Sequence, residues 1–261
     1  MKEEEEFWER KLPKELILHS KDDGIIYKYT SLETAIKIIE SNSLYYSSPN
    51  VFNDPFDLSI EFLETKFNEK QIRDVLEGWN VDKELKEKAI NHYINNPNEL
   101  SLIMRDTFEK QKNESGITCF SKSPLKALMW SHYADKHKGI CLGFSFKNEE
   151  EKFIQAPIDY AHEIKKINYA EDTRLGVYKW LFTKSHVWDY EEEIRRVSNI
   201  GNGLIPFRTN ELKEIYFGLK LDKNQVKKIN QILSEHLFKL DKISVIEMNK
   251  KTFDLKETEI D

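Results

Sequence analysis

Residues 117–146 read ITCFSKSPLKALMWSHYADKHKGICLGFSF. Ile117–Ser121 is an apolar run of strand length. Pro124 suits the first turn of a helix that carries Trp130, because the first helical turn does not need the backbone N–H that proline lacks. Gly139 then opens a second strand, in which large apolar residues alternate with smaller ones. This stretch predicts a strand, a helix and a strand in close succession.

The rest of the chain continues the same mixed pattern. Apolar residues at helical spacing predict helices at 32–42, 68–110 with a break at 95–98, 173–184 and 226–237. Strands are predicted at 25–29, 44–47, 188–197, 215–219, 243–248 and 253–255. Because strands and helices do not repeat in regular βαβ units, the sequence predicts an α+β fold and not a doubly wound one.

Composition limits the class of protein. The 261 residues are 39% hydrophobic and 33% charged, which is typical of a folded globular chain. The formal net charge of −6 provides no overall basic field for nucleic acid. Cys119 and Cys141 are too few for a disulfide framework, so we expect both thiols to be buried and reduced.

The N-terminal sequence MKEEEE is acidic, the wrong sign for a signal peptide. No apolar run reaches the roughly 20 residues that cross a bilayer. We therefore expect a cytoplasmic protein without membrane contact. Residues 1–23 are expected to form a charged helix or extension. Residues 24–261 are expected to form one domain, with a helical insertion at about 65–112.

The first polar motif is Tyr27-Lys28-Tyr29-Thr30, at the end of the first predicted strand. Lys28 is suited to contact a ligand while a tyrosine stacks on a flat ring. The alternative is an ordinary edge strand with an exposed lysine.

The second motif is Phe52-Asn53-Asp54-Pro55-Phe56. Asn53 and Asp54 follow a predicted strand, where the rim of a pocket is expected. The alternative, which turn chemistry favours, is a structural turn in which these side chains bond their own backbone.

The third motif runs from Cys119-Phe120-Ser121 to the helix with Trp130 and Tyr133. Those two aromatic residues are three apart and share a helix face, which is more often a core feature than a site. His132 and His137 lack further clustered ligands, so the sequence predicts no metal site.

The fourth motif is Trp188-Asp189-Tyr190-Glu191-Glu192-Glu193-Ile194-Arg195. In a strand, Glu191, Glu193 and Arg195 would share one face. The functional interpretation is a carboxylate pair lining a cleft, with Arg195 favouring an ionised carboxylate. The alternative is a solvated face with weak salt bridges.

Together and in this order, the four motifs resemble a large uncharacterised bacterial family with the signature YKY, FNDP, CFS, MWxHYA and WxxExExR. The resemblance runs from about Ile25 to about Leu255. That family in turn looks like the ADP-ribosyltransferase fold, which implies a split antiparallel sheet with peripheral helices. Lys28 then occupies the position of a histidine in that fold, and Ser121 lies on the central serine-containing strand.

The resemblance also implies a site at which the four motifs meet in one cleft. Glu193 is the implied catalytic carboxylate, and Glu191 is implied to orient or deprotonate an acceptor. The residues implied to bind NAD, the substrate, are Lys28, Tyr29, Thr30, Asn53, Asp54, Ser121, Trp130, Tyr133 and Arg195. No metal is required.

The implied function is ADP-ribosyl transfer from NAD by a bacterial toxin or phage-defence effector. The acceptor is a macromolecule, either RNA, DNA or protein, and the setting leaves room for an antitoxin or a defence partner protein. Three alternatives stay open: a nucleotide-binding sensor without turnover, an interaction protein without pocket chemistry, and a metal-dependent hydrolase.

Overall fold

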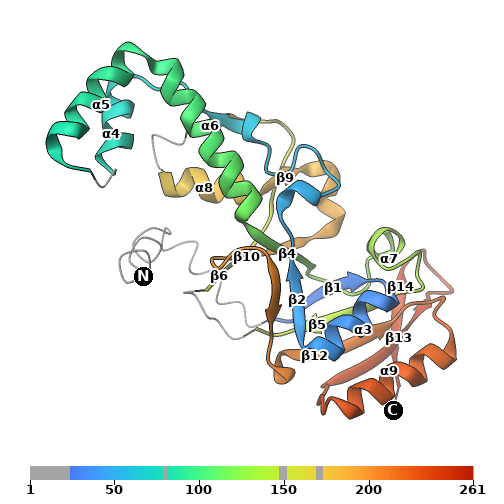
Figure 1. The fold of residues 1–261 in the computed structure, drawn as a ribbon. Coiled ribbons are helices and arrows are strands. Elements are labelled where there is room, and N and C mark those ends of the chain that lie inside the picture. The colour runs from blue at the N-terminus through green and yellow to red at the C-terminus, as the bar shows by residue number, and fades with distance from the viewer. Residues whose placement is uncertain (1–23, 79–80, 147–151, 169–172, 261) are drawn as a thin grey trace. The chain divides into compact units, whose positions relative to one another are not determined.

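A computed structural model describes residues 24–78, 81–146, 152–168 and 173–260 (Figure 1). The charged helix or extension expected at residues 1–23 lies outside them. The chain divides into two compact units. The sheet unit contains residues 24–47, Gly116–Ile158 and 187–260, and the helical unit contains Ser48–Ser115 and Asp159–His186. The helices that we expected as an insertion at about 65–112 therefore form one compact unit together with a later segment, Asp159–His186.

The sheet unit is built on an eight-stranded sheet in the order β14-β13-β12-β5-β1-β4-β10-β6 (Figure 1). The strands are β1 (Ile26–Thr30), β4 (Gly116–Ser121), β5 (Ile140–Phe144), β6 (Phe153–Pro157), β10 (Glu193–Ser198), β12 (Leu212–Phe217), β13 (Lys242–Met248) and β14 (Leu255–Glu259). All neighbours are antiparallel except β12 and β13, which are parallel. The α+β class is confirmed, and the observed sheet is mixed, whereas the resemblance implied a split antiparallel sheet.

Each face of this sheet has its own apolar core. Helices α3 (Leu32–Ser41) and α9 (Lys223–Glu235) pack on one face, where Ile39, Leu142 and Ile229 are fully buried. Helix α7 (Ala127–Tyr133) lies on the opposite face, where Trp130 packs with Cys141 and Tyr216. A two-stranded ribbon of β2 (Ser43–Tyr46) and β11 (Gly203–Pro206) completes the unit.

Local sequence explains why α3 begins and ends where it does. The Ser31 side chain accepts a hydrogen bond from the Thr34 backbone N–H and caps the first turn. Asn42 adopts the left-handed conformation, with φ 47°, and closes the last turn. Both ends agree with the sequence prediction.

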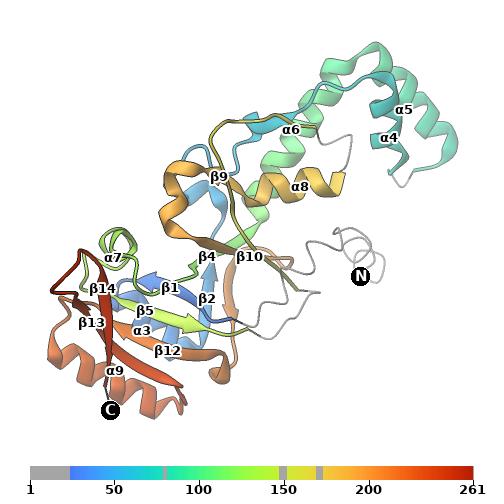
Figure 2. The ribbon, with the colours of Figure 1, turned by 180° about the vertical axis from the view of Figure 1, so that it is seen from behind.

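The helical unit contains α4 (Glu69–Glu77), α5 (Lys83–Asn95), α6 (Pro97–Glu114) and α8 (Thr173–Phe182) (Figure 2). Pro97 stands in the first turn of α6, which confirms the predicted break in the 68–110 helical region. The rings of Phe108 and Trp180 pack edge to face with centroids 5.4 Å apart. Two short parallel pairs join β3 (Leu63–Glu64) to β8 (Ile167–Asn168) and β7 (Asp159–Ala161) to β9 (Thr183–Ser185).

Three predictions require correction. The strand expected at 188–197 begins only at Glu193, because η3 (His186–Glu191) is a 3₁₀ helix and Glu192 has φ 43°. Pro124 precedes α7, which starts at Ala127. Cys141 is buried as predicted, but Cys119 is only partly buried. None of the helices that the structure describes is long and apolar enough to cross a membrane.

Candidate functional site

Three residues, each from a different motif, lie side by side on three neighbouring strands of the sheet unit. Ser121, the last residue of β4, is paired with Tyr27 of β1 on one side and with Glu193 of β10 on the other. Directly paired residues of antiparallel strands present their side chains to the same face. Tyr27, Ser121 and Glu193 therefore share the face that carries α7.

Glu193 and Arg195 form a buried ion pair on this face. The Arg195 Nε atom donates a hydrogen bond to Glu193 Oε1 over 2.9 Å, and the two side chains are 0% and 2% exposed respectively. The pair follows from the strand period of two, as the sequence predicted. A guanidinium at this distance favours the ionised form of the carboxylate.

Glu191 reaches the same region from the end of η3. Its carboxylate accepts a hydrogen bond from Tyr133 Oη over 2.6 Å, and its backbone carbonyl accepts one from Ser121 Oγ over 2.7 Å. Glu192, which lies between the two buried glutamates, has φ 43° and contacts Lys126. The left-handed turn at Glu192, and not strand alternation, sets the positions of Glu191 and Glu193.

Tyr29 and Trp130 form the aromatic part of the site. Their rings meet edge to face with centroids 5.2 Å apart, and both residues are buried. Tyr29 Oη donates to the Ser123 carbonyl over 2.8 Å and accepts from the Lys126 backbone N–H. Trp130 Nε1 donates to the Pro124 carbonyl. These contacts fix both rings, and burial raises the pKa of Tyr29 far above its ordinary value.

Lys28 lies on the face of the sheet opposite to that of Tyr27, Ser121 and Glu193. Its partner in β5 is Leu142, a residue of the core beneath α3 and α9. Lys28 Nζ donates to Thr118 Oγ1 over 2.8 Å and lies 5.4 Å from the centre of the Phe120 ring. Burial lowers the pKa of Lys28, and the charge of Glu193 partly opposes this shift. Thr30 is also buried on that face, paired with Ile140.

Sequence reasoning missed a third carboxylate on the α7 face, that of Glu214. Tyr27 Oη and Tyr216 Oη donate hydrogen bonds to the same Glu214 oxygen, over 3.0 and 2.6 Å. Burial, followed by the neighbouring Glu214 charge, raises the pKa of Tyr27 above its ordinary value. The sequence around this carboxylate, Glu214-Ile215-Tyr216, lies in a strand outside the four motifs, so no motif pointed to it.

Asn53 and Asp54 belong to the helical unit. Asp54 is 5% exposed and its Oδ1 atom accepts from the Phe56 backbone N–H over 2.9 Å, which is the turn chemistry of the alternative interpretation. Asn53 is exposed. Three of the four motifs are thus within the sheet unit, and the second motif is within the helical unit.

The described residues contain no cluster of three or more His, Cys, Asp or Glu side chains that could hold a metal ion. His132 Nδ1 lies 3.1 Å from Tyr190 Oη, and His137 Nε2 lies 3.1 Å from Ser131 Oγ. Both histidines are therefore engaged by hydroxyl groups.

Comparison with known proteins gives one match. Residues 129–196 match the model of an uncharacterised family described as "Protein of unknown function (DUF2971)". The match starts in α7 and ends in β10, so it includes Tyr133, Glu191, Glu193 and Arg195. Searches of curated proteins and of solved structures found no match.

Proposed function

We propose that the chain transfers ADP-ribose from NAD, with Glu193 as the catalytic carboxylate. The observation that carries the proposal is the line of Tyr27, Ser121 and Glu193 across β1, β4 and β10. Cleaving the bond between nicotinamide and ribose builds positive charge on the sugar. A fixed carboxylate that bonds the ribose 2-hydroxyl stabilises this charge as it develops.

The neighbouring residues take roles consistent with their contacts. Arg195 holds the Glu193 carboxylate in place over 2.9 Å. Glu191, held by Tyr133, orients or deprotonates the acceptor. Tyr27 replaces Lys28 as the β1 residue on the catalytic face, because register places Lys28 against the other core. No step needs a metal ion.

The burial of Glu193 adds a requirement to this mechanism. Its side chain is 2% exposed, so NAD reaches it only after neighbouring side chains move. Tyr133, which bonds Glu191, and Tyr190, which precedes Glu191 in the fourth motif, are both partly exposed. They are therefore the residues expected to move. The acceptor is a macromolecule, RNA, DNA or protein, and the setting is a bacterial toxin or defence effector.

The test is release of nicotinamide from NAD by the purified chain. Glu193→Gln keeps the shape of the side chain and is expected to lower turnover on the order of 100- to 1,000-fold. Glu192→Gln is the matched control, because Glu192 is partly exposed and is not on the strand face. Equal activity of wild type and Glu193→Gln would reject the catalytic assignment.

A second function, nucleotide binding without turnover, is favoured by the fact that Glu191, Glu193 and Arg195 are all buried with partners. A sensor needs such a rigid site but no carboxylate that takes part in a reaction. Saturable NAD binding without nicotinamide release, in the presence of RNA, DNA and protein acceptors, supports this function over transfer.

A further inference from the structure

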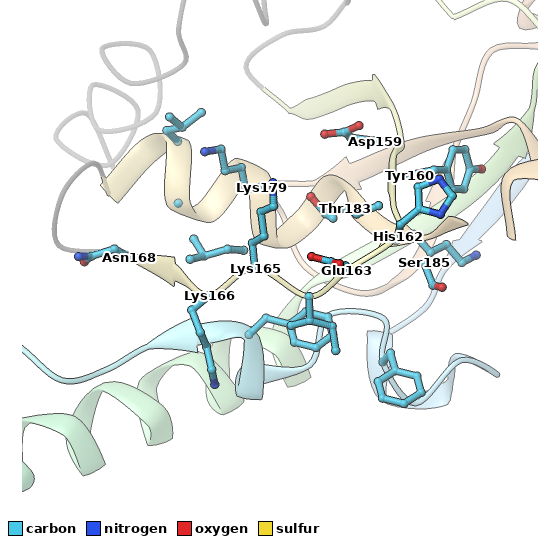
Figure 3. A pocket seen from close by; sticks show the side chains of 18 residues that line it. Asp159, Tyr160, His162, Glu163, Lys165, Lys166, Asn168, Lys179, Thr183 and Ser185 are labelled. Carbon is cyan, nitrogen blue, oxygen red and sulfur yellow. The ribbon is translucent and has the colours of Figure 1, made fainter. Parts of the chain in front are cut away.

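The helical unit contains a cavity of about 830 Å³, which the second sequence motif reaches only through its last residue, Phe56. Its walls come from β7, the segment 162–166, β8, α8 and β9, with Phe56 and Phe62 from an earlier segment (Figure 3). This volume is within the range of roughly 300–1,000 Å³ found for small-molecule sites.

Positive charge predominates in this cavity. Four lysines line it, Lys165, Lys166, Lys179 and Lys184, against two carboxylates, Asp159 and Glu163. Lys166 donates to the Glu61 carbonyl. Within the described part of the chain, no ion pair is formed by Lys165 or Lys179.

Lys165 and Lys179 come from two separate segments of the cavity wall. Figure 3 shows Lys165 rising from the segment before β8 toward α8, the helix that carries Lys179. Both side chains are exposed. Two such ammonium groups provide charge-assisted donors for a phosphate.

The cavity also leaves apolar surface uncovered. Phe56 is 56% exposed and Ile164 is 59% exposed, and both line the cavity, as do Phe62 and Leu175. Exposed apolar side chains gathered at a concave site are typical of ligand binding. A ligand that fits needs a flat or apolar part and an anionic part.

We propose that this cavity binds a nucleotide. Lys165 and Lys179 bind the phosphate, the phenylalanine side chains contact the base, and Asp159 or Glu163 accepts hydrogen bonds from ribose hydroxyls. The nucleotide is either free in solution or a unit of a single-stranded nucleic acid, since both present the same phosphate, sugar and base. The proposal is independent of the site around Glu193.

Titration calorimetry on the full-length chain tests the proposal with four probes: ADP, adenosine, inorganic phosphate and a short single-stranded oligonucleotide. ADP or the oligonucleotide is expected to bind saturably. Adenosine and phosphate, which each lack one half of the ligand, are expected to bind at least about tenfold more weakly. Raising the salt concentration should weaken ADP binding and leave adenosine binding unchanged.

The decisive variant is Lys165→Ala/Lys179→Ala, which should weaken the binding on the order of 10- to 100-fold. The matched control is Lys70→Ala/Lys83→Ala, because these two lysines are exposed on α4 and α5 of the same unit and do not line the cavity. Melting temperatures of both variants check folding. The binding of ADP alone identifies a free nucleotide, and the binding of the oligonucleotide alone identifies a nucleic acid chain.

Three results would overturn the proposal. Neither ADP nor the oligonucleotide binds; the cavity variant binds as tightly as wild type; or the control variant loses affinity to the same extent, which would indicate non-specific attraction to positive charge.

Discussion

Arg195 Nε and Glu193 Oε1 are 2.9 Å apart in a pair whose side chains are almost completely excluded from solvent. The two residues are on one face of β10, two positions apart. Burying such a pair removes both charges from water, and this desolvation penalty offsets much of their attraction. Removing only one partner is strongly destabilising, because it leaves the other charge buried and uncompensated. The pair therefore makes the stability of the sheet unit sensitive to removal of one partner.

Arg195→Met is expected to lower the free energy of unfolding by about 3–5 kcal/mol, because it leaves the Glu193 carboxylate buried without its guanidinium. Adding Glu193→Gln to Arg195→Met should restore part of the loss. Lys213→Met, which breaks a more exposed ion pair with Asp241, should cost less than about 1 kcal/mol. Urea unfolding curves measure all three. A loss below about 1 kcal/mol for Arg195→Met would show that the pair is not required for folding.

Tyr133→Phe removes the hydroxyl that bonds the buried Glu191 carboxylate over 2.6 Å. We expect a loss of about 1–3 kcal/mol in the free energy of unfolding, since a buried acceptor is left with fewer donors. Tyr190→Phe is the matched control, because Tyr190 bonds the exposed His132 and should cost less than about 1 kcal/mol. Equal losses for the two variants in urea unfolding would contradict this account.

The left-handed turn at Glu192 gives a backbone prediction. Glu192→Gly and Glu192→Val both remove the contact with Lys126, so their difference isolates the conformation of the backbone. Glycine adopts φ 43° without steric cost and valine does not, so the valine variant should be less stable by about 1–2 kcal/mol or more. If thermal unfolding gives the same midpoint for both variants, the turn at Glu192 does not hold the two glutamates in place.

The two thiols should react at different rates with a bulky thiol reagent in the native state. Cys141 is completely buried and Cys119 is partly buried, so Cys119 should be labelled first. The variants Cys119→Ala and Cys141→Ala assign the two phases of labelling. Faster labelling of Cys141 than of Cys119 would require a different packing beneath α7.

Burial also raises the pKa of Cys141 well above its ordinary value, with a further contribution from Glu214. The folded chain then keeps the thiol proton at a pH where the unfolded chain has lost it, so the free energy of unfolding falls as pH rises above about 8.5. The slope from this one thiol is at most about 1.4 kcal/mol per pH unit. Urea unfolding from about pH 7 to about pH 9.5, below the titration of tyrosine, should show a shallower fall for Cys141→Ala. An unchanged slope would exclude this thiol as the cause.

The sequence alone determined most elements and the fold class. The capped ends of α3, the helical region broken before Pro97 and the strands at 117–121 and 140–144 follow from side-chain spacing and from the backbone limits of proline and asparagine. Spacing also placed Glu193 and Arg195 on one strand face, which the structure confirms. Each of these features depends on residues only a few positions apart, so the local sequence is enough to predict it.

Only the tertiary structure decided which face of β1 meets Glu193. Strand alternation puts Lys28 and Tyr27 on opposite faces of β1, but it does not say which of the two shares a face with Glu193 of β10. The pairing of Ser121 with Tyr27 and with Glu193 settles this in favour of Tyr27. Register across three strands depends on pairing between residues 94 positions apart (Tyr27 and Ser121) and 72 positions apart (Ser121 and Glu193), and no local pattern contains it. The lysine-lined cavity is hidden from the sequence for the same reason, since its walls come from segments around 56–62, 159–168 and 175–185.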